Sequence, residues 1–281
     1  MTGDDRSAWV RPAAGCLAAA VFALTILLGA CGPKGDGKSV SSTPDAMRLL
    51  NAAVARLAAD DLALNMRSSE TEVTVKGGEC RSEEVAADVD IQAPSQVRGW
   101  IEGDMGGGTR VKMDVVAVDT GTIYVRLPDG SGWMAVETDQ NDSPANTFAD
   151  YKKEMEAVDT ARVTGIGDVD GVSCWVVAVT VDVVEDERLQ ADQGLAKDVA
   201  KALGISRQQA EAAFPDATDK ALIWIGRDDG ILCRIEDDVI VNVGAGGTYE
   251  AHGDTYFTQY GKTIDPPIAV PSPLVTHMSG D

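Results

Sequence analysis

Histidine is scarce in this sequence, which limits the chemistry that the protein can perform. Only His252 and His277 occur among 281 residues. Neither lies in a context typical of a Ser-His-Asp triad or a Cys-His pair, and His252 is predicted to lie in a loop. The cysteines lack the spacing of a zinc motif. We therefore expect no catalytic residues, no bound metal, no cofactor and no enzymatic activity.

Aromatic side chains are also few, at 5% of the residues. Four tryptophans fall on predicted strands, where core packing explains them better than stacking on a sugar or a base. They are Trp100, Trp133, Trp175 and Trp224. Paired carboxylates could still hydrolyse a glycosidic bond, but the sequence does not indicate which two acids would approach each other. An extracellular hydrolase is therefore the least supported function.

Basic residues are outnumbered by acidic ones, 24 to 45, which gives a formal net charge of −21. A polyanion of this kind is repelled by nucleic acid and by anionic lipid surfaces. The acids are spread along the chain and not gathered in one tail, so a solvated surface explains them better than an acidic binding site. We expect no nucleic-acid partner and no polybasic attachment to a membrane.

One long apolar run, residues 13–30, follows Arg6 and Arg11 and contains no charge. It ends in the sequence Leu-Gly-Ala-Cys at positions 28–31, which resembles the lipobox of bacterial lipoprotein signals. The resemblance implies cleavage before Cys31 and attachment of acyl chains, such as palmitate, to that residue. Two or three chains anchor a protein stably. An uncleaved transmembrane helix is the alternative, because the run could just span a bilayer.

The predicted domain organisation follows from this signal. Residues 1–30 form the lipoprotein signal peptide, and residues 31–42, rich in Gly, Ser, Lys and Pro, form a flexible tether. Residues 43–275 form a single domain, and residues 276–281 form a tail. The predicted location is the extracytoplasmic face of the cell membrane, with the lipid on Cys31 as the membrane contact and the domain as a monomer.

Five cysteines occur, and two of them, Cys16 and Cys31, are assigned to the signal and to the lipid. Of the remaining three, one pair can form a disulfide outside the cytoplasm. Cys80 lies in a predicted turn, so we expect a Cys80–Cys174 disulfide and a buried free thiol at Cys233.

The first half of the domain changes from helical to alternating hydrophobic periodicity. A helix is predicted over residues 43–60, with an apolar stripe of Ala46, Leu50, Ala53, Val54 and Leu57. After Asn65 the period becomes two, and a hairpin is predicted around Gly77-Gly78. Tight turns then separate predicted strands over residues 97–102, 110–118, 122–127 and 133–137, which is typical of an antiparallel meander.

The second half mixes helices and strands. Helices are predicted over residues 143–157 and 185–203, and a capping box, Ser206 with Gln209, predicts a further short helix. Predicted strands cover residues 161–165, 172–183 (the longest), 222–225, 231–237, 239–243 and 255–260.

Two glycine-containing segments resemble ligand loops but favour turns. Asp168 and Asp170 before Gly171 have oxygen ligands suited to calcium, yet they lack the twelve-residue loop and its closing Glu. The sequence Gly-Ala-Gly-Gly at positions 244–247 follows a strand but precedes no helix, so a hairpin turn is favoured over a phosphate site.

Four short patterns resemble those of the actinobacterial lipoproteins of the LppX/LprG group, in the same order along the chain. They are residues 122–126 followed by Gly132-Trp133, residues 169–172 before a long strand, residues 222–225 followed by 229–234, and residues 260–262 before Pro266-Pro267. The resemblance implies an α+β fold: a curved antiparallel sheet, or half-barrel, with helices packed on its concave face. It also implies a lipid or glycolipid ligand in the space between sheet and helices.

The leading interpretation is therefore a membrane-anchored cell-envelope lipoprotein that binds or carries a hydrophobic ligand. The alternative is a non-enzymatic, surface-anchored interaction or sensor protein with a filled core. Periodicity nominates the side chains that would line a ligand cavity. They are Leu50, Val54, Leu57, Val177, Val179, Leu195, Val199, Trp224 and Ile235.

Overall fold

A computed structural model describes most of the predicted domain. The described residues are 44–57, 62–92, 96–104, 110–119, 121–126, 128, 132–137, 156–190, 195–272 and 274–278. The predicted signal peptide and tether lie outside this part of the chain, as does nearly all of the helix predicted over residues 143–157.

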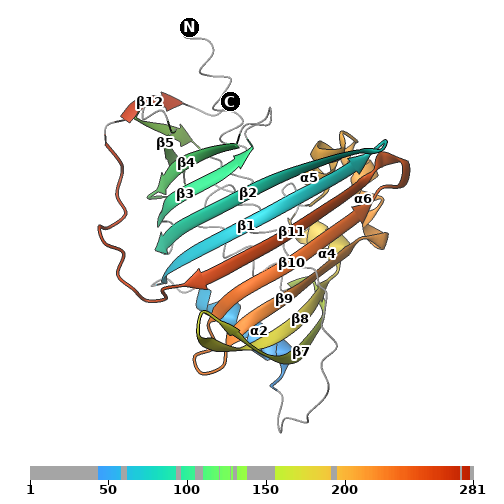
Figure 1. Cartoon of the computed structure of the whole chain (residues 1–281), viewed down its shortest axis with the longest axis horizontal. Coiled ribbons are helices and arrows are strands. Elements are labelled where there is room, and N and C mark those ends of the chain that lie inside the picture. The colour runs from blue at the N-terminus through green and yellow to red at the C-terminus, as the bar shows by residue number, and fades with distance from the viewer. Residues whose placement is uncertain are drawn as a thin grey trace, which may run out of the picture.

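Twelve strands form one curved, open sheet in the order β12-β6-β5-β4-β3-β2-β1-β11-β10-β9-β8-β7 (Figure 1). Every neighbouring pair is antiparallel except β12 with β6, which is parallel. The strands are β1 Ala63–Lys76, β2 Glu79–Gln92, β3 Gln96–Asp104, β4 Arg110–Ala117, β5 Thr122–Arg126, β6 Trp133–Glu137, β7 Val158–Val169, β8 Val172–Val181, β9 Thr218–Gly226, β10 Leu232–Asn242, β11 Thr248–Thr258 and β12 Leu274–Met278.

Short turns set most of this order, because consecutive strands joined by tight turns must pair antiparallel. Gly77 and Gly78 have positive φ angles of 61° and 87° between β1 and β2, which glycine adopts without steric cost. The antiparallel pairing between the strands farthest apart in sequence is β1 with β11, running from Asn65 opposite Thr258 to Val75 opposite Thr248. It joins the first half of the domain to the second.

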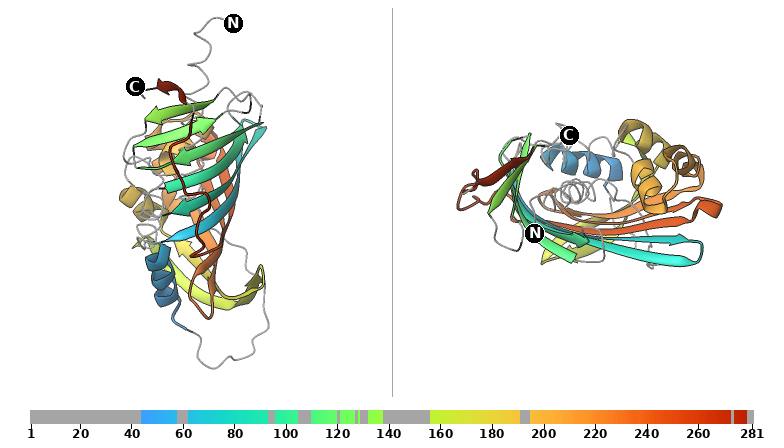
Figure 2. Two further views of the ribbon diagram at one scale, coloured as in Figure 1. Left: turned by 90° about the vertical axis from the view of Figure 1, so that its left-hand side faces the viewer. Right: turned by 90° about the horizontal axis from the view of Figure 1, so that it is seen from above.

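The described helices lie on the concave side of the sheet (Figure 2). They are α2 Ala46–Leu57, α4 Val183–Gln190, α5 Leu195–Leu203 and α6 Arg207–Glu211, followed by the 3-10 helix η4 Phe214–Asp216. The predicted α+β half-barrel is confirmed. The predicted capping box is confirmed as well, because the Ser206 side chain accepts from the Gln209 backbone and the Gln209 side chain accepts from the Ser206 backbone.

Several predicted boundaries are wrong. The single helix predicted over residues 185–203 is two helices, α4 and α5. The strand predicted over residues 172–183 is not the longest, since β1 and β2 have 14 residues each. Residues 239–243 largely continue β10, His252 lies in β11 and not in a loop, and the predicted tail contributes its first residues to β12.

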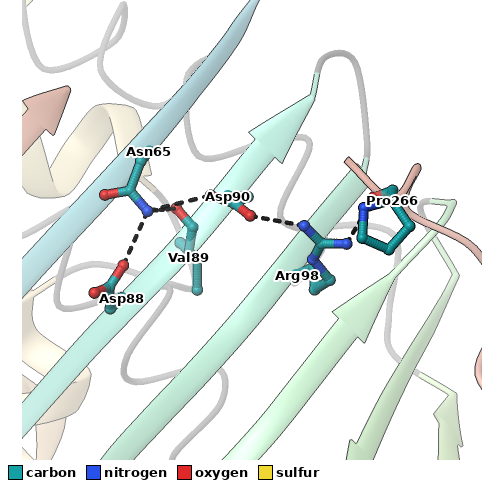
Figure 3. Close-up of polar contacts among 6 residues, drawn as sticks. All are labelled: Asn65, Asp88, Val89, Asp90, Arg98 and Pro266. Atoms are coloured by element: carbon teal, nitrogen blue, oxygen red, sulfur yellow. Dashed lines mark hydrogen bonds and ion pairs between the residues drawn. The ribbon is translucent and has the colours of Figure 1, made fainter. Parts of the chain in front are cut away.

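The outer face of the sheet carries its own small apolar clusters. Near β4 to β6, Val116, Tyr124 and Ala135 pack with Ile268 of the C-terminal segment, residues 261–272. Arg98 on β3 holds this segment, since its side chain donates to the Pro266 carbonyl oxygen at 2.7 Å and to Asp90 on β2 at 3.0 Å (Figure 3).

The predicted Cys80–Cys174 disulfide is wrong. All three cysteines of the described chain are free thiols: Cys80 is exposed, and Cys174 and Cys233 are buried. Cys80 lies on β2 and Cys174 on β8, which are five strands apart in the sheet. Five strand spacings amount to about 24 Å along the sheet, whereas the Cα atoms of a disulfide lie within about 7 Å. The predicted burial of Cys233 is confirmed.

Candidate functional site

The concave face of the sheet is the candidate site, because most of the buried apolar side chains point into it. Its larger cluster, here called the inner apolar cluster, combines Leu50, Ala53 and Leu57 of α2 with side chains from every strand from β1 to β11. A second cluster joins α5 and α6 to the other ends of β10 and β11 through residues such as Val199, Leu203 and Tyr249. Strand alternation produces this face, because every second residue points inward.

Eight of the nine predicted lining residues lie on this concave side. Those from α2 and the sheet fall in the inner apolar cluster, and the two from α5 fall in the second cluster. The prediction for Trp224 is wrong, because this side chain lies on the outer face with Cys174 and Cys233. There the guanidinium carbon of Arg234 is 4.6 Å from the centroid of the Trp224 ring. Residues in the inner apolar cluster are Leu50, Val54, Leu57, Val177, Val179 and Ile235, and residues in the second cluster are Leu195 and Val199.

Helix α5 is fixed over β1 and β11 by contacts at both of its ends. At its start, the Ala196 N–H donates to Glu187 Oε2 of α4 at 3.0 Å. At its end, Lys76 of β1 donates to the Leu203 carbonyl oxygen, and Gly204 follows with a φ of +58°. An acid at the start and a cation at the end both complement the helix dipole.

Three carboxyl groups also point into this concave face, and they are here called the carboxyl row. Glu70 lies on β1, Asp237 on β10 and Asp219 on β9, with exposed fractions of 6%, 0% and 7%. Each occupies an inward position in the alternation of its strand. Because Glu70 and Asp237 both pair with Gly253 of β11, no side chain stands between them on the sheet.

Burial raises the pKa of all three carboxyl groups well above the usual value. Nearby acids raise the pKa further: Asp237 acts on Glu70, Asp219 on Asp237, and Asp186 on Asp219. A buried carboxylate without a cation is unfavourable, so the protonated form is favoured.

Acidic neighbours extend the row toward α5. Burial, followed by the charges of Asp198 and Glu83, raises the pKa of Glu72 to about 7. Burial raises the pKa of Asp198 to about 6, although Lys197 and Lys201 act in the opposite direction.

Sequence reasoning missed the carboxyl row, although a signal existed. Glu70 and Asp237 occupy positions where the period of two predicts a buried apolar residue, four residues from Met66 and two residues from Val239. A charged residue at an inward position is unusual enough to mark a site. Assembling the row also requires the long-range pairing of β1 with β11.

A cleft of about 500 Å³ lies between α4, α6 and η4. Its charged groups are paired, with Arg207 donating to Glu187 at 2.7 Å and to Glu211 at 2.7 Å. Its lining residues are Val184, Glu187, Arg188, Arg207, Glu211, Phe214 and Pro215.

Within the described ranges, no group of three or more His, Cys, Asp or Glu side chains is arranged to hold a metal ion. No helix in that part of the chain is long and apolar enough to cross a membrane. Asp168 accepts from the Gly171 N–H at 2.9 Å in the turn between β7 and β8, consistent with the turn favoured for this segment.

The fold and this face define an α+β half-barrel with a helix-covered, largely apolar concave side. Solved structures similar to it include the lipoprotein LppX of Mycobacterium tuberculosis, with 15% identity, 78% of this chain and 96% of the other covered, and a TM-score of 0.46. LprF of Mycobacterium bovis is 15% identical, the match covers 81% of this chain and 98% of LprF, and the TM-score is 0.49. A LolA superfamily protein of Nitrosomonas europaea is 10% identical, the match covers 80% of this chain and 96% of that protein, and the TM-score is 0.27.

At sequence identities of 10% to 15%, similarity to these structures shows the fold alone. LppX is one of the two proteins that give their names to the group that the sequence resembles. No model of a known protein family matches the sequence. No curated protein is similar to it in sequence.

Proposed function

We propose that this chain is a membrane-anchored cell-envelope lipoprotein that binds or carries a hydrophobic ligand, a lipid or glycolipid, on its concave face. The role is binding without catalysis and needs no cofactor. The acyl chains on Cys31 hold it at the extracytoplasmic face of the cell membrane, and residues 31–42 give the domain reach.

The width of the inner apolar cluster carries the proposal. All strands from β1 to β11 contribute to it, and the ten spacings between them amount to about 48 Å along the curved sheet. Helix α2 has 12 residues, so it is about 18 Å long and about 10 Å wide. Among the described residues, α2 contributes most of the helical side chains of this cluster, and Leu189 of α4 also packs against it. The length of α2 matches only part of the width of the sheet, and in this proposal acyl chains lie beside it.

Native mass spectrometry and solvent extraction of protein purified without detergent test the ligand. We expect an acyl lipid to co-purify with the folded domain. A dry core with no lipid would contradict the proposal and would favour the alternative, an interaction or sensor protein with a filled core.

A matched pair of variants on β2 sharpens this test. Ala87 is buried on the inner face, and its neighbour Ala86 points outward and is partly exposed. Ala87→Phe should fill ligand space and reduce the bound lipid, whereas Ala86→Phe should not. Circular dichroism of both variants checks that they fold, and equal lipid content in two folded variants would count against an inner ligand.

The anchor has a separate test. Cys31→Ala should release the protein from the membrane fraction and leave the domain folded. A variant that stays membrane-bound after signal cleavage would show that Cys31 is not the anchor.

A further inference from the structure

The carboxyl row divides the two apolar clusters of the concave face. Toward one end of the strands, Ile235 and Ile223 belong to the inner apolar cluster. Toward the other end, Val239 and Ala251 belong to the cluster beneath α5. Asp237 lies between Ile235 and Val239 on β10, so the row forms a polar boundary inside an otherwise apolar face.

The sheet positions beside the row carry small residues. Gly253 separates Glu70 from Asp237, and Ala221 of β9 pairs with Asp237 on its other side. Ala251 lies one inward position further along β11. Glu70 and Asp237 are therefore the largest side chains in the line of paired residues that runs from β1 across β11 and β10 to β9.

Three carboxyl oxygens of the row lack a hydrogen-bond partner among the described residues. They are both Oδ atoms of Asp237 and Oδ1 of Asp219, and the neighbouring Thr255 Oγ1 lacks a partner as well. The backbone N–H of Gly253 lowers the pKa of Asp237 but does not reach hydrogen-bond geometry. Asp237 is fully buried. In the same part of the chain, no ion pair involves Glu70, Asp219 or Asp237. Buried polar atoms are nearly always paired, so these acceptors indicate a missing donor.

The surroundings of the row select the chemistry of that donor. Ten groups act on the row or on its acidic neighbours. They are Glu72, Glu83, Asp238, Tyr249 and Asp254 on the sheet, Lys197, Asp198 and Lys201 on α5, and Asp186 and Glu187 on α4. Acids predominate, which disfavours an anion. A metal ion is disfavoured because the described residues hold no ligand set for one.

We infer that the carboxyl row binds the ammonium group of an amphiphilic ligand whose acyl chain lies on the inner apolar cluster. A protonated amine supplies up to three N–H donors and one positive charge. It would pair with oxygens contributed by β1, β9 and β10, while its hydrocarbon chain would follow the adjacent apolar surface. This inference rests on the proposed function and adds the class of headgroup to it.

Three probes with the same chain and different headgroups test the inference: dodecylamine, dodecanol and dodecanoate. Titration calorimetry of delipidated protein at pH 7 should give about tenfold or tighter binding of dodecylamine than of dodecanol, with dodecanoate the weakest. Binding of the amine should also release protons from the row, measured as a dependence of the heat on buffer ionisation enthalpy.

Matched variants on β10 assign the effect. Asp237→Asn should reduce the preference for the amine to near that for the alcohol and should diminish proton release, while binding of dodecanol is kept. Glu236→Gln is the control, because Glu236 lies beside Asp237 on β10, points to the outer face, where it pairs with Arg234 at 2.9 Å, and is not among the groups that act on Asp237. Glu70→Gln provides a second inner variant if Asp237→Asn does not fold.

The outcomes separate this inference from the proposed function. Equal binding of the three probes without proton release would overturn the ammonium site and leave a general hydrophobic binder. Tighter binding of dodecanoate would also overturn it. No binding of any probe would contradict both proposals.

Discussion

Cys174 and Cys233 meet on the outer face of the sheet, although they lie on β8 and β10 with β9 between them. Each thiol affects the pKa of the other through a side-chain hydrogen bond, and burial raises the pKa of Cys233 to about 12. Cys233 reaches this face because the pairing of β10 with β9 shifts between Leu232 and Arg234.

The thiols should therefore differ in reactivity. At pH 7, Cys80 should react rapidly with iodoacetamide, while Cys174 and Cys233 should react only on unfolding, because burial and a raised pKa disfavour the thiolate. Mass spectrometry of labelled peptides measures this. Rapid labelling of Cys233 in the folded protein would contradict the structure.

Oxidised glutathione should form a mixed disulfide with the exposed Cys80 and leave Cys174 and Cys233 unbridged in the folded protein. Two strand spacings put the Cα atoms of the two buried cysteines about 10 Å apart, whereas those of a disulfide lie within about 7 Å. Peptide mapping without reduction measures this, and a Cys174–Cys233 bridge in the folded protein would be the contrary result.

The raised pKa of Glu72 predicts that stability falls as pH rises. The pKa is 4.5 without perturbation and about 7 in the folded protein, so between these values the folded state binds more protons than the unfolded state. This contribution is present below pH 4.5 and is lost above pH 7. Glu70, Asp219 and Asp237 act in the same direction.

We expect the free energy of unfolding to be about 3 kcal/mol higher at pH 5 than at pH 8, measured by urea denaturation. Glu72→Gln should reduce this difference, whereas Glu250→Gln, exposed on β11, should leave it unchanged. A stability that rises steadily from pH 5 to pH 8 would refute the assignment.

Arg98 links β3 to the C-terminal segment and to Asp90, so its loss should loosen that segment. Arg98→Ala should cost about 1 kcal/mol and speed hydrogen exchange in residues 261–272. Arg81→Ala is the control, because its ion pair with Glu79 is 4.0 Å long and exposed. Equal exchange in both variants would show that Arg98 does not hold the segment.

Glu187 joins α4, α5 and α6, since it accepts from Ala196 and pairs with Arg207. Glu187→Ala should lower the free energy of unfolding by about 2 kcal/mol, because it leaves the buried Ala196 N–H without its acceptor and removes one of the acids that pair with Arg207. Glu187→Gln should cost less. Glu185→Ala, whose partner Arg188 is exposed, should have little effect in the same denaturation experiment.

Local patterns in the sequence predicted what depends on neighbours along the chain. The alternating runs predicted most strands, Gly77-Gly78 predicted the first hairpin, and Ser206 with Gln209 predicted the cap of α6. The α+β half-barrel itself came from the family resemblance, and it too is confirmed. The inward residues of α2 and β8 also followed from periodicity, because a repeat of 3.6 or 2 fixes which side chains share a face.

Tertiary structure decided what depends on register between distant strands. Periodicity assigned Trp224 to the lining, but the alternation of β9, with Ile223 and Ile225 inward, places it outside. Only the pairings of β1 and β10 with β11 bring Glu70 and Asp237 to the same glycine. Glu70 lies more than a hundred positions from both Gly253 and Asp237, and no local pattern encodes their contact. The sequence therefore predicted an apolar lining, and the structure added a carboxyl row.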